Sequence, residues 1–231
     1  MLSKELINEF ERKLNDFWTQ EILHNDNFIS MLNRREAGHG LANYIETKTQ
    51  EELVNISNNR YQLINEKNIR SMGDFWIKEG TCNFYTPVNI KTGIKIGSPN
   101  IVTIDKIITG IAKRKIDSYY LFIIKFIKIN RRWQVNICKI VNLFNILDYV
   151  VFDLGPLQLM LNEHKLYSNI NDIQHVEYDL KDILSKFCKL YSDGYPSFIA
   201  NRNERKNKYE HMLNNFDVNK PIDQSKIKWK Q

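Results

Sequence analysis

The chain has 231 residues, of which 42% are hydrophobic, 12% aromatic and 26% charged. This composition excludes a disordered, collagen-like or mucin-like chain, and the length suits one domain with a sizeable core. The three cysteines, an odd number without short spacing, argue against a disulfide framework and against a cysteine-based zinc site. The formal net charge of +6 favours an anionic partner, although charge alone identifies none.

Neither the start of the chain nor its most apolar segment carries a sign of export or membrane insertion. Acidic residues interrupt the apolar ones at the start, which therefore lacks the continuous apolar run of a signal peptide. Residues 119–129 are too few to span a bilayer and contain two lysines. We expect a cytoplasmic protein that makes no membrane contact.

Helical spacing dominates the first third of the chain. Apolar residues recur every three to four positions over residues 1–20 and again over 40–54, which predicts two amphipathic helices. A third helical piece is expected over residues 60–71.

The apolar period then changes to that of strands. Residues 74–78 and 84–91 are predicted to form two strands joined by a turn at Glu79-Gly80. The second strand is expected to start at or just after Pro87, because proline offers no N–H to a strand ladder. Residues 93–100 contain Gly, Ser and Pro and are expected to form a loop.

Helix and strand signals alternate through the rest of the chain. Residues 101–115 have helical spacing, whereas 119–129 and 133–141 indicate a buried strand and its antiparallel return. An apolar segment at 144–161 is interrupted by Gly155-Pro156, and residues 178–216 are predicted to be helical with a break at 194–196. We therefore expect a single α/β domain over residues 1–231, with a central mixed β-sheet flanked by helices.

The residues that point to chemistry lie in the predicted hairpin. Asp74 stands at the start of one strand, and the next strand ends with Asn89 and Lys91. Side chains two residues apart share a face of a strand, so Asn89 and Lys91 can meet Asp74 on one side of the hairpin. Oxygen ligands for a hard cation beside a fixed ammonium group are what phosphodiester hydrolysis requires.

These residues resemble the core of the PD-(D/E)XK nucleases, and among them the type II restriction endonucleases. Gly73-Asp74 resembles the first metal-binding half of the motif, and PVNIK, ending at Lys91, resembles the second half. GHGLANYIE, ending at Glu46, is similar to the N-terminal helix whose glutamate faces the active site. GSPN at 97–100 and DLGPLQL at 153–159 add to the likeness, which covers residues 36–160 as a scattered pattern.

The resemblance implies a restriction-endonuclease-like core with a magnesium site. Asp74, Asn89, Glu46 and the main-chain carbonyl of Ile90 would bind Mg²⁺, with Glu79 as the second candidate for the missing carboxylate, and Lys91 would be the catalytic lysine. The family usually has Asp or Glu where this chain has Asn89, which brings an oxygen but no charge. Asp74 therefore needs Glu46 or Glu79 beside it for the site to be active.

Several residues are candidates for DNA contacts, and each also has a structural interpretation. Ser98 and Asn100 are more simply explained as caps of the helix expected from Ile101, and Gln158 suits either adenine readout or a satisfied buried amide. Basic clusters are usually solvated faces, although phosphate neutralisation supplies much of DNA affinity. The candidate DNA-binding residues are Arg34, Arg35, His39, Lys95, Ser98, Asn100 and Gln158.

The function implied by the resemblance is that of a type II restriction endonuclease. Such an enzyme would use Mg²⁺ to hydrolyse double-stranded DNA at a short recognition site, leaving 5′-phosphates. It would act as a homodimer beside a cognate DNA methyltransferase. The alternatives are a non-specific, repair or mobile-element nuclease of the same fold, a DNA-binding module with a degenerate site, and a protein-interaction domain whose charge is incidental.

Overall fold

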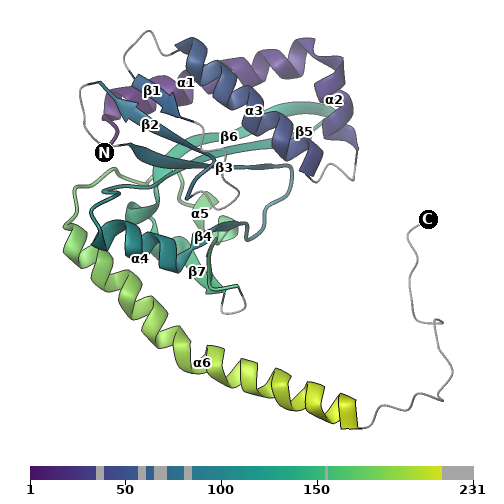
Figure 1. The fold of residues 1–231 in the computed structure, drawn as a ribbon. Coiled ribbons are helices and arrows are strands. Elements are labelled where there is room, and N and C mark those ends of the chain that lie inside the picture. Colours follow the sequence, from purple (N-terminus) through teal and green to yellow (C-terminus); the bar gives the residue numbers. More distant parts are fainter. Residues whose placement is uncertain (35–38, 57–60, 65–71, 81–84, 154–155, 215–231) are drawn as a thin grey trace, which may run out of the picture.

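A five-stranded mixed sheet forms the centre of the molecule (Figure 1). The computed structural model describes residues 1–34, 39–56, 61–64, 72–80, 85–153 and 156–214. The strands follow the order β1-β2-β3-β5-β6, in which β3 and β5 are parallel and the other neighbours are antiparallel. Their bounds are Tyr61–Ile64 (β1), Phe75–Glu79 (β2), Thr86–Gly93 (β3), Tyr120–Ile129 (β5) and Arg132–Asn142 (β6).

Three N-terminal helices cover one face of this sheet (Figure 1). They are α1 (Lys4–His24), α2 (Asp26–Asn33) and α3 (His39–Ile56), so the two helices predicted over 1–20 and 40–54 are confirmed. The apolar stripe of α1 is buried with Phe122 and Phe126 of β5, because alternate strand residues point to this side. The stripe consists of Leu6, Ile7, Phe10, Leu14 and Trp18.

A second core lies on the opposite face of the sheet. Leu121 and Ile123 of β5 pack there against helix α4 (Ile104–Ala112) and a three-stranded antiparallel sheet of order β4-β8-β7. The remaining bounds are Asn100–Thr103 (β4), Val150–Asp153 (β7), Gln158–Leu161 (β8), Glu163–Tyr167 (α5), Leu180–Asn214 (α6), and the short 3₁₀ helices Leu143–Asn145 (η1) and Leu147–Tyr149 (η2). The chain crosses from β3 to the parallel β5 through β4 and α4 on this side.

Four expectations about element boundaries are wrong. The piece expected to be helical at 60–71 begins with strand β1, whose residues pair with β2; residues 65–71 lie outside the described part of the chain. Strand β3 begins at Thr86, so Pro87 lies inside it opposite Trp76. The helix expected from Ile101 starts at Ile104, because residues 100–103 pair with β8 instead. Thr103 is therefore the N-cap residue, and the capping role expected for Ser98 and Asn100 does not exist.

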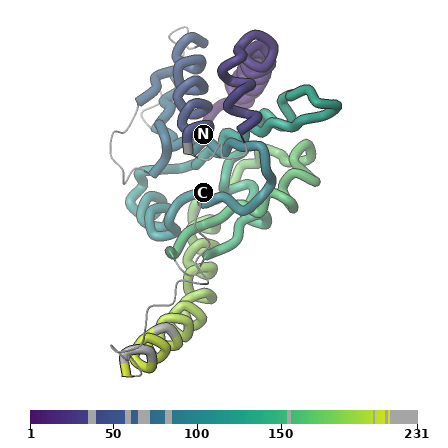
Figure 2. Tube along the Cα trace, turned by 90° about the vertical axis from the view of Figure 1, so that its right-hand side faces the viewer, coloured from purple at the N-terminus to yellow at the C-terminus, as the bar shows by residue number. Residues whose placement is uncertain are grey.

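The long C-terminal helix α6 runs through the break expected at Gly194-Tyr195-Pro196. Pro196 lies inside the helix, where it removes one backbone donor but does not end the helix. Only the first part of α6 packs on the body, through Ile183 and Phe187, and the rest extends away from it (Figures 1 and 2). The break expected at 194–196 is therefore wrong.

The predicted fold class, an α/β domain with a central mixed sheet flanked by helices, is confirmed. The buried strand expected at 119–129 and its return at 133–141 are β5 and β6. Within the described part of the chain, no helix combines the length and apolarity needed to cross a membrane.

Candidate active site

Asp74 is fixed at the start of β2 by the backbone of β3. Its N–H donates to the carbonyl of Val88 at 2.8 Å, and its Oδ2 accepts the N–H of Ile90 at 2.6 Å. The preceding Gly73 makes this approach possible, since a Cβ atom there would lie 2.5 Å from the Val88 oxygen. The Gly73-Asp74 pair therefore has a direct geometric basis: the glycine allows close contact, and the carboxylate is anchored to the neighbouring strand.

Lys91 and Asn89 share one face of β3, as their spacing predicted. The alternate residues Val88 and Ile90 point into the core beneath α1 and α3, which leaves residues 89 and 91 on the other side. Burial lowers the pKa of Lys91, whereas the negative charges of Asp74 and Glu46 raise it. The ammonium group is thus removed from most solvent and lies among carboxylates.

Glu46 of α3 completes a cluster with Asp74 and Lys91. Burial, and secondly repulsion by the charge of Asp74, raise the pKa of Glu46 to about 7, and Lys91 partly opposes this. Burial also raises the pKa of Asp74, while the Ile90 N–H and Lys91 lower it. The three side chains come from α3, the start of β2 and β3, and lie close enough for their charges to interact. The candidate catalytic residues Glu46, Asp74 and Lys91 are therefore brought together.

Asn89 is buried, with 9% of its surface exposed. Its Nδ2 lies 3.5 Å from the carbonyl of Ile101, which it can reach only in a long hydrogen bond, and its side chain also interacts with the Tyr119 hydroxyl. The amide Oδ1 has no hydrogen-bond partner among the described residues. A buried acceptor without a donor is costly, and a cation would satisfy it.

The chemistry of this cluster fits a hard divalent cation. Two carboxylates, of which Asp74 raises the pKa of Glu46, and an unsatisfied amide oxygen are the oxygen ligands that Mg²⁺ prefers, and a cation would relieve the repulsion of Glu46 by Asp74. Within the described residues, no group of three or more His, Cys, Asp or Glu side chains is arranged for a metal. The remaining ligands would be water, main chain or substrate oxygens, which Mg²⁺ commonly retains.

Glu79 lies away from this cluster. It is the last residue of β2, and its carboxylate accepts the N–H of Ser3 at 2.8 Å and the Ser3 hydroxyl at 2.5 Å. Asp74 precedes the first residue of the same strand, so the length of β2 separates the two carboxylates. Of the two glutamates weighed as the second carboxylate, the structure places Glu46 beside Asp74 and leaves Glu79 at the N-terminus of α1.

The candidate DNA-binding residues lie in three places. Lys95, Ser98 and Asn100 are exposed on the segment that follows β3, next to the end that carries Lys91. Gln158 begins β8 opposite Thr103, with its Oε1 buried and unpaired among the described residues. The others lie on or near the α2–α3 connection: Arg34 is exposed at the end of α2, Arg35 lies outside the described residues, and so does the side chain of His39.

A buried ion pair beside the cluster was missed in the sequence. Lys125 Nζ and Glu163 Oε1 are 2.7 Å apart, with side chains only 7% and 1% exposed. Lys125 could have been recognised, because a lysine inside the apolar run YYLFIIKFIKI must find a partner if that strand is buried. Glu163 gives no such signal, since Asn162-Glu163 looks like the ordinary start of a helix.

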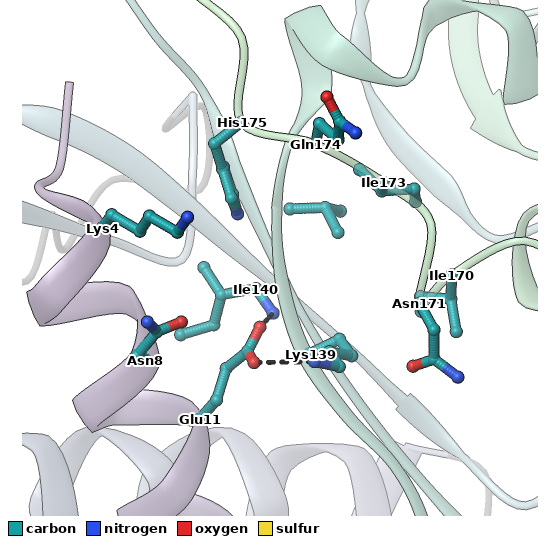
Figure 3. Close-up of a pocket in the computed structure, with 11 residues that line it drawn as sticks. Lys4, Asn8, Glu11, Lys139, Ile140, Ile170, Asn171, Ile173, Gln174 and His175 are labelled. Carbon is teal, nitrogen blue, oxygen red and sulfur yellow. Dashed lines mark hydrogen bonds and ion pairs between the residues drawn. The ribbon is translucent and has the colours of Figure 1, made fainter.

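A polar cavity of about 370 Å³ lies elsewhere, between α1, β6 and residues 170–175 (Figure 3). Its central carboxylate, Glu11, is already engaged: Oε1 accepts the N–H of Ile140 at 2.8 Å and Oε2 pairs with Lys139 at 2.9 Å. Glu11 thus joins α1 to the edge strand of the sheet. The cavity contains none of the candidate catalytic residues.

Comparisons with known proteins do not assign this chain. No family model matches it, and no curated protein is significantly similar to it.

Proposed function

We propose that the protein is a Mg²⁺-dependent endonuclease that hydrolyses the backbone of double-stranded DNA, of the PD-(D/E)XK type. The observation that carries the proposal is the meeting of Glu46, Asp74 and Lys91, from three separate elements, in one electrostatically coupled cluster. Two carboxylates that can hold a divalent cation, beside a partly desolvated lysine, are groups that phosphodiester hydrolysis uses.

In the proposed reaction, the side chains position the cation and the attacking water. Bound Mg²⁺ would neutralise charge that develops on the scissile phosphate and favour ionisation of water. Asp74 and Glu46 would hold the cation, with Asn89 Oδ1 and the Ile90 carbonyl as further ligands. Asp74 is suited to this because the Ile90 N–H fixes its Oδ2. Lys91 would orient the attacking water and help to remove its proton, which burial assists by lowering the pKa of the lysine.

More specifically, we propose a type II restriction endonuclease that cuts at a short recognition site and leaves 5′-phosphates. The exposed segment with Lys95, Ser98 and Asn100 lies beside the cluster, where it would contact the DNA. Cutting both strands at one site is most simply done by a homodimer, and host DNA would need protection by a cognate methyltransferase. The cytoplasm is the compartment in which such a pair would act.

The decisive experiment incubates the purified protein with unmethylated phage or plasmid DNA, with Mg²⁺ or with EDTA. Discrete Mg²⁺-dependent fragments are expected, and Lys91→Met should reduce their rate of formation by about a hundredfold or more because it removes the fixed ammonium group. Lys78→Met, the same change on the neighbouring strand β2, is the matched control and should cut normally. A smear in place of discrete fragments would support the non-specific nuclease.

A cation-binding measurement distinguishes a nuclease that is inactive under the assay conditions from a DNA-binding module that has lost its cation site. Ca²⁺ should raise the thermal unfolding midpoint of the wild type, and Asp74→Asn should abolish the increase. The neutral, buried Asn89 favours the second candidate, a DNA-binding module with a degenerate site. Salt-dependent DNA binding, with neither cleavage nor a response to Ca²⁺, would establish that candidate instead.

A further inference from the structure

We propose that Glu163 and Lys125 form a positioning pair that holds residues 95–97 against the end of β3, beside the candidate active site. Neither residue is proposed to touch substrate; each acts through the segment that carries Lys95, Ser98 and Asn100. The inference rests on the proposed function for its effect on DNA, whereas the clamping of the segment is a property of the free protein.

The pair is built from complete and buried contacts. The ion pair of 2.7 Å joins Lys125 Nζ to Glu163 Oε1, which also accepts the Tyr167 hydroxyl at 2.7 Å. Glu163 Oε2 accepts the N–H of Gly97 at 2.8 Å. Both oxygens of the carboxylate are therefore occupied, and each partner comes from a different part of the chain.

Three of the contacts end on the backbone of the exposed segment. Gly97 donates its N–H to Glu163 Oε2, and its carbonyl accepts the Glu163 N–H at 3.2 Å. Lys125 Nζ donates to the carbonyl of Lys95 at 3.3 Å. Because residues 95–97 belong to neither sheet, these bonds replace the strand pairing that would otherwise hold their backbone.

The pair adjoins the row of residues that carries Lys91. Lys125 of β5 lies opposite Gly93 of β3 in the parallel register, two residues beyond Lys91 and on the same face. A Cβ atom on Gly93 would lie 3.7 Å from Lys125 Nζ, so the ammonium group packs directly over the end of the catalytic strand. The charges of both Glu163 and Lys125 also act on Lys91.

Stability is a poor explanation for such a pair. Removing two charges from water costs free energy that their attraction often fails to recover, so apolar replacements of buried pairs are frequently neutral or stabilising. What an ion pair provides here is two directed sets of hydrogen bonds to one backbone segment. The Lys125–Glu163 pair lies between β5, α5 and residues 95–97. This position is explained if residues 95–97 must keep one conformation in order to bind DNA.

The test compares Glu163→Gln with Glu11→Gln. Both changes remove the negative charge from a carboxylate that pairs with a lysine of the same sheet and accepts a backbone N–H, but Glu11 lies at the edge strand β6. In Glu163→Gln, we expect amide exchange at residues 95–98 to accelerate at least tenfold while β5 amides stay protected. The KM for DNA should rise at least fivefold, a larger change than the one in kcat that follows from losing a negative charge near Lys91. Glu11→Gln should change neither quantity.

A double variant guards against misfolding. Lys125→Met with Glu163→Gln leaves neither charge of the pair unpaired, and it should fold while retaining faster exchange at residues 95–98. The proposal is overturned if exchange there is unchanged in both variants, or if KM responds equally to Glu11→Gln. If the wild type does not cleave DNA, faster exchange together with at least fivefold weaker DNA binding still supports the positioning pair, and only the proposed cleavage fails.

Discussion

Glu46 is the residue whose environment has the plainest consequence for stability. Its pKa of about 7, raised by burial and by Asp74, means that the folded protein holds a proton that the unfolded chain releases near pH 4.5. The protonated form therefore contributes stability that is fully present below pH 4.5 and is lost as the pH rises through 7. In the ionised state, this carboxylate destabilises the fold unless a cation binds it.

Glu46→Gln should therefore stabilise the cation-free protein at alkaline pH. In EDTA at pH 8, we expect the free energy of unfolding to increase by about 1–2 kcal/mol, which allows for solvent screening of a half-buried group. At pH 4.5 the variant and the wild type should differ little. Urea unfolding at both pH values measures the difference, with Glu52→Gln on the same helix as control. A stability gain that is independent of pH would contradict this account.

Sequence spacing was informative at this scale only where the backbone fixed the geometry. Gly73-Asp74, Asn89 and Lys91 could be predicted because strand alternation and one hairpin determine how they meet. Glu46 comes from a distant helix, and its place was anticipated only through the family resemblance. The Lys125–Glu163 pair depends on tertiary packing between β5 and α5, which no local pattern encodes.

Among the elements, α1 and β2 are joined end to end by Ser3 and Glu79. Ser3 caps α1 by accepting the Leu6 N–H, and Glu79 in turn accepts both the hydroxyl and the N–H of Ser3. The carboxylate thus fixes the cap that starts the helix. This arrangement gives Glu79 a structural task and separates it from the cation site.

Glu79→Ala should consequently destabilise the fold without impairing chemistry. The loss of two hydrogen bonds at a helix cap should reduce the free energy of unfolding by about 1–2 kcal/mol. Ca²⁺ stabilisation and the kcat for DNA should match the wild type, and Glu79→Gln, which keeps one acceptor, should lose less stability. Chemical unfolding and single-turnover cleavage measure the two effects. A hundredfold loss of kcat in Glu79→Ala would instead return Glu79 to the metal site.

Whole elements were predictable where the hydrophobic period was long. The 3–4 spacing of α1 and the long, mostly apolar run of β5 each extend over enough residues to distinguish helix from strand. The short elements failed because their structure depends on a partner: β1 exists through pairing with β2, and β4 through pairing with β8. Pro196 shows the opposite error, a strong local signal that the surrounding helix overrides.

At the scale of the molecule, one sheet separates two cores. Phe122 and Leu121, neighbours in β5, point into the core beneath α1–α3 and into the core beneath α4, respectively. Because β5 and β6 contribute residues to both cores, loss of the sheet exposes the sheet-facing side of each core. We expect the two halves to unfold together.

Single-tryptophan variants can test this cooperativity. Trp18 lies within the first core and Trp76 packs against the second, so each reports on one side. The urea midpoints of the two signals should coincide, and Phe122→Ala or Leu121→Ala, each costing about 2–5 kcal/mol, should shift both equally. Two separate midpoints would show that the sheet does not couple the cores.

The parallel pairing of β3 with β5 has a consequence for how this fold can change over time. Parallel neighbours cannot be joined by a tight turn, so residues 94–119 must travel from one end of the sheet to the other. Lys95, Ser98 and Asn100 all lie in this crossover connection, whereas Asp74 and Lys91 lie on the sheet itself. Mutation and insertion can therefore change the connection at residues 94–119 while the sheet keeps its register. New DNA-sequence preferences could evolve in this connection, or be engineered by exchanging it, without changing the proposed catalytic residues.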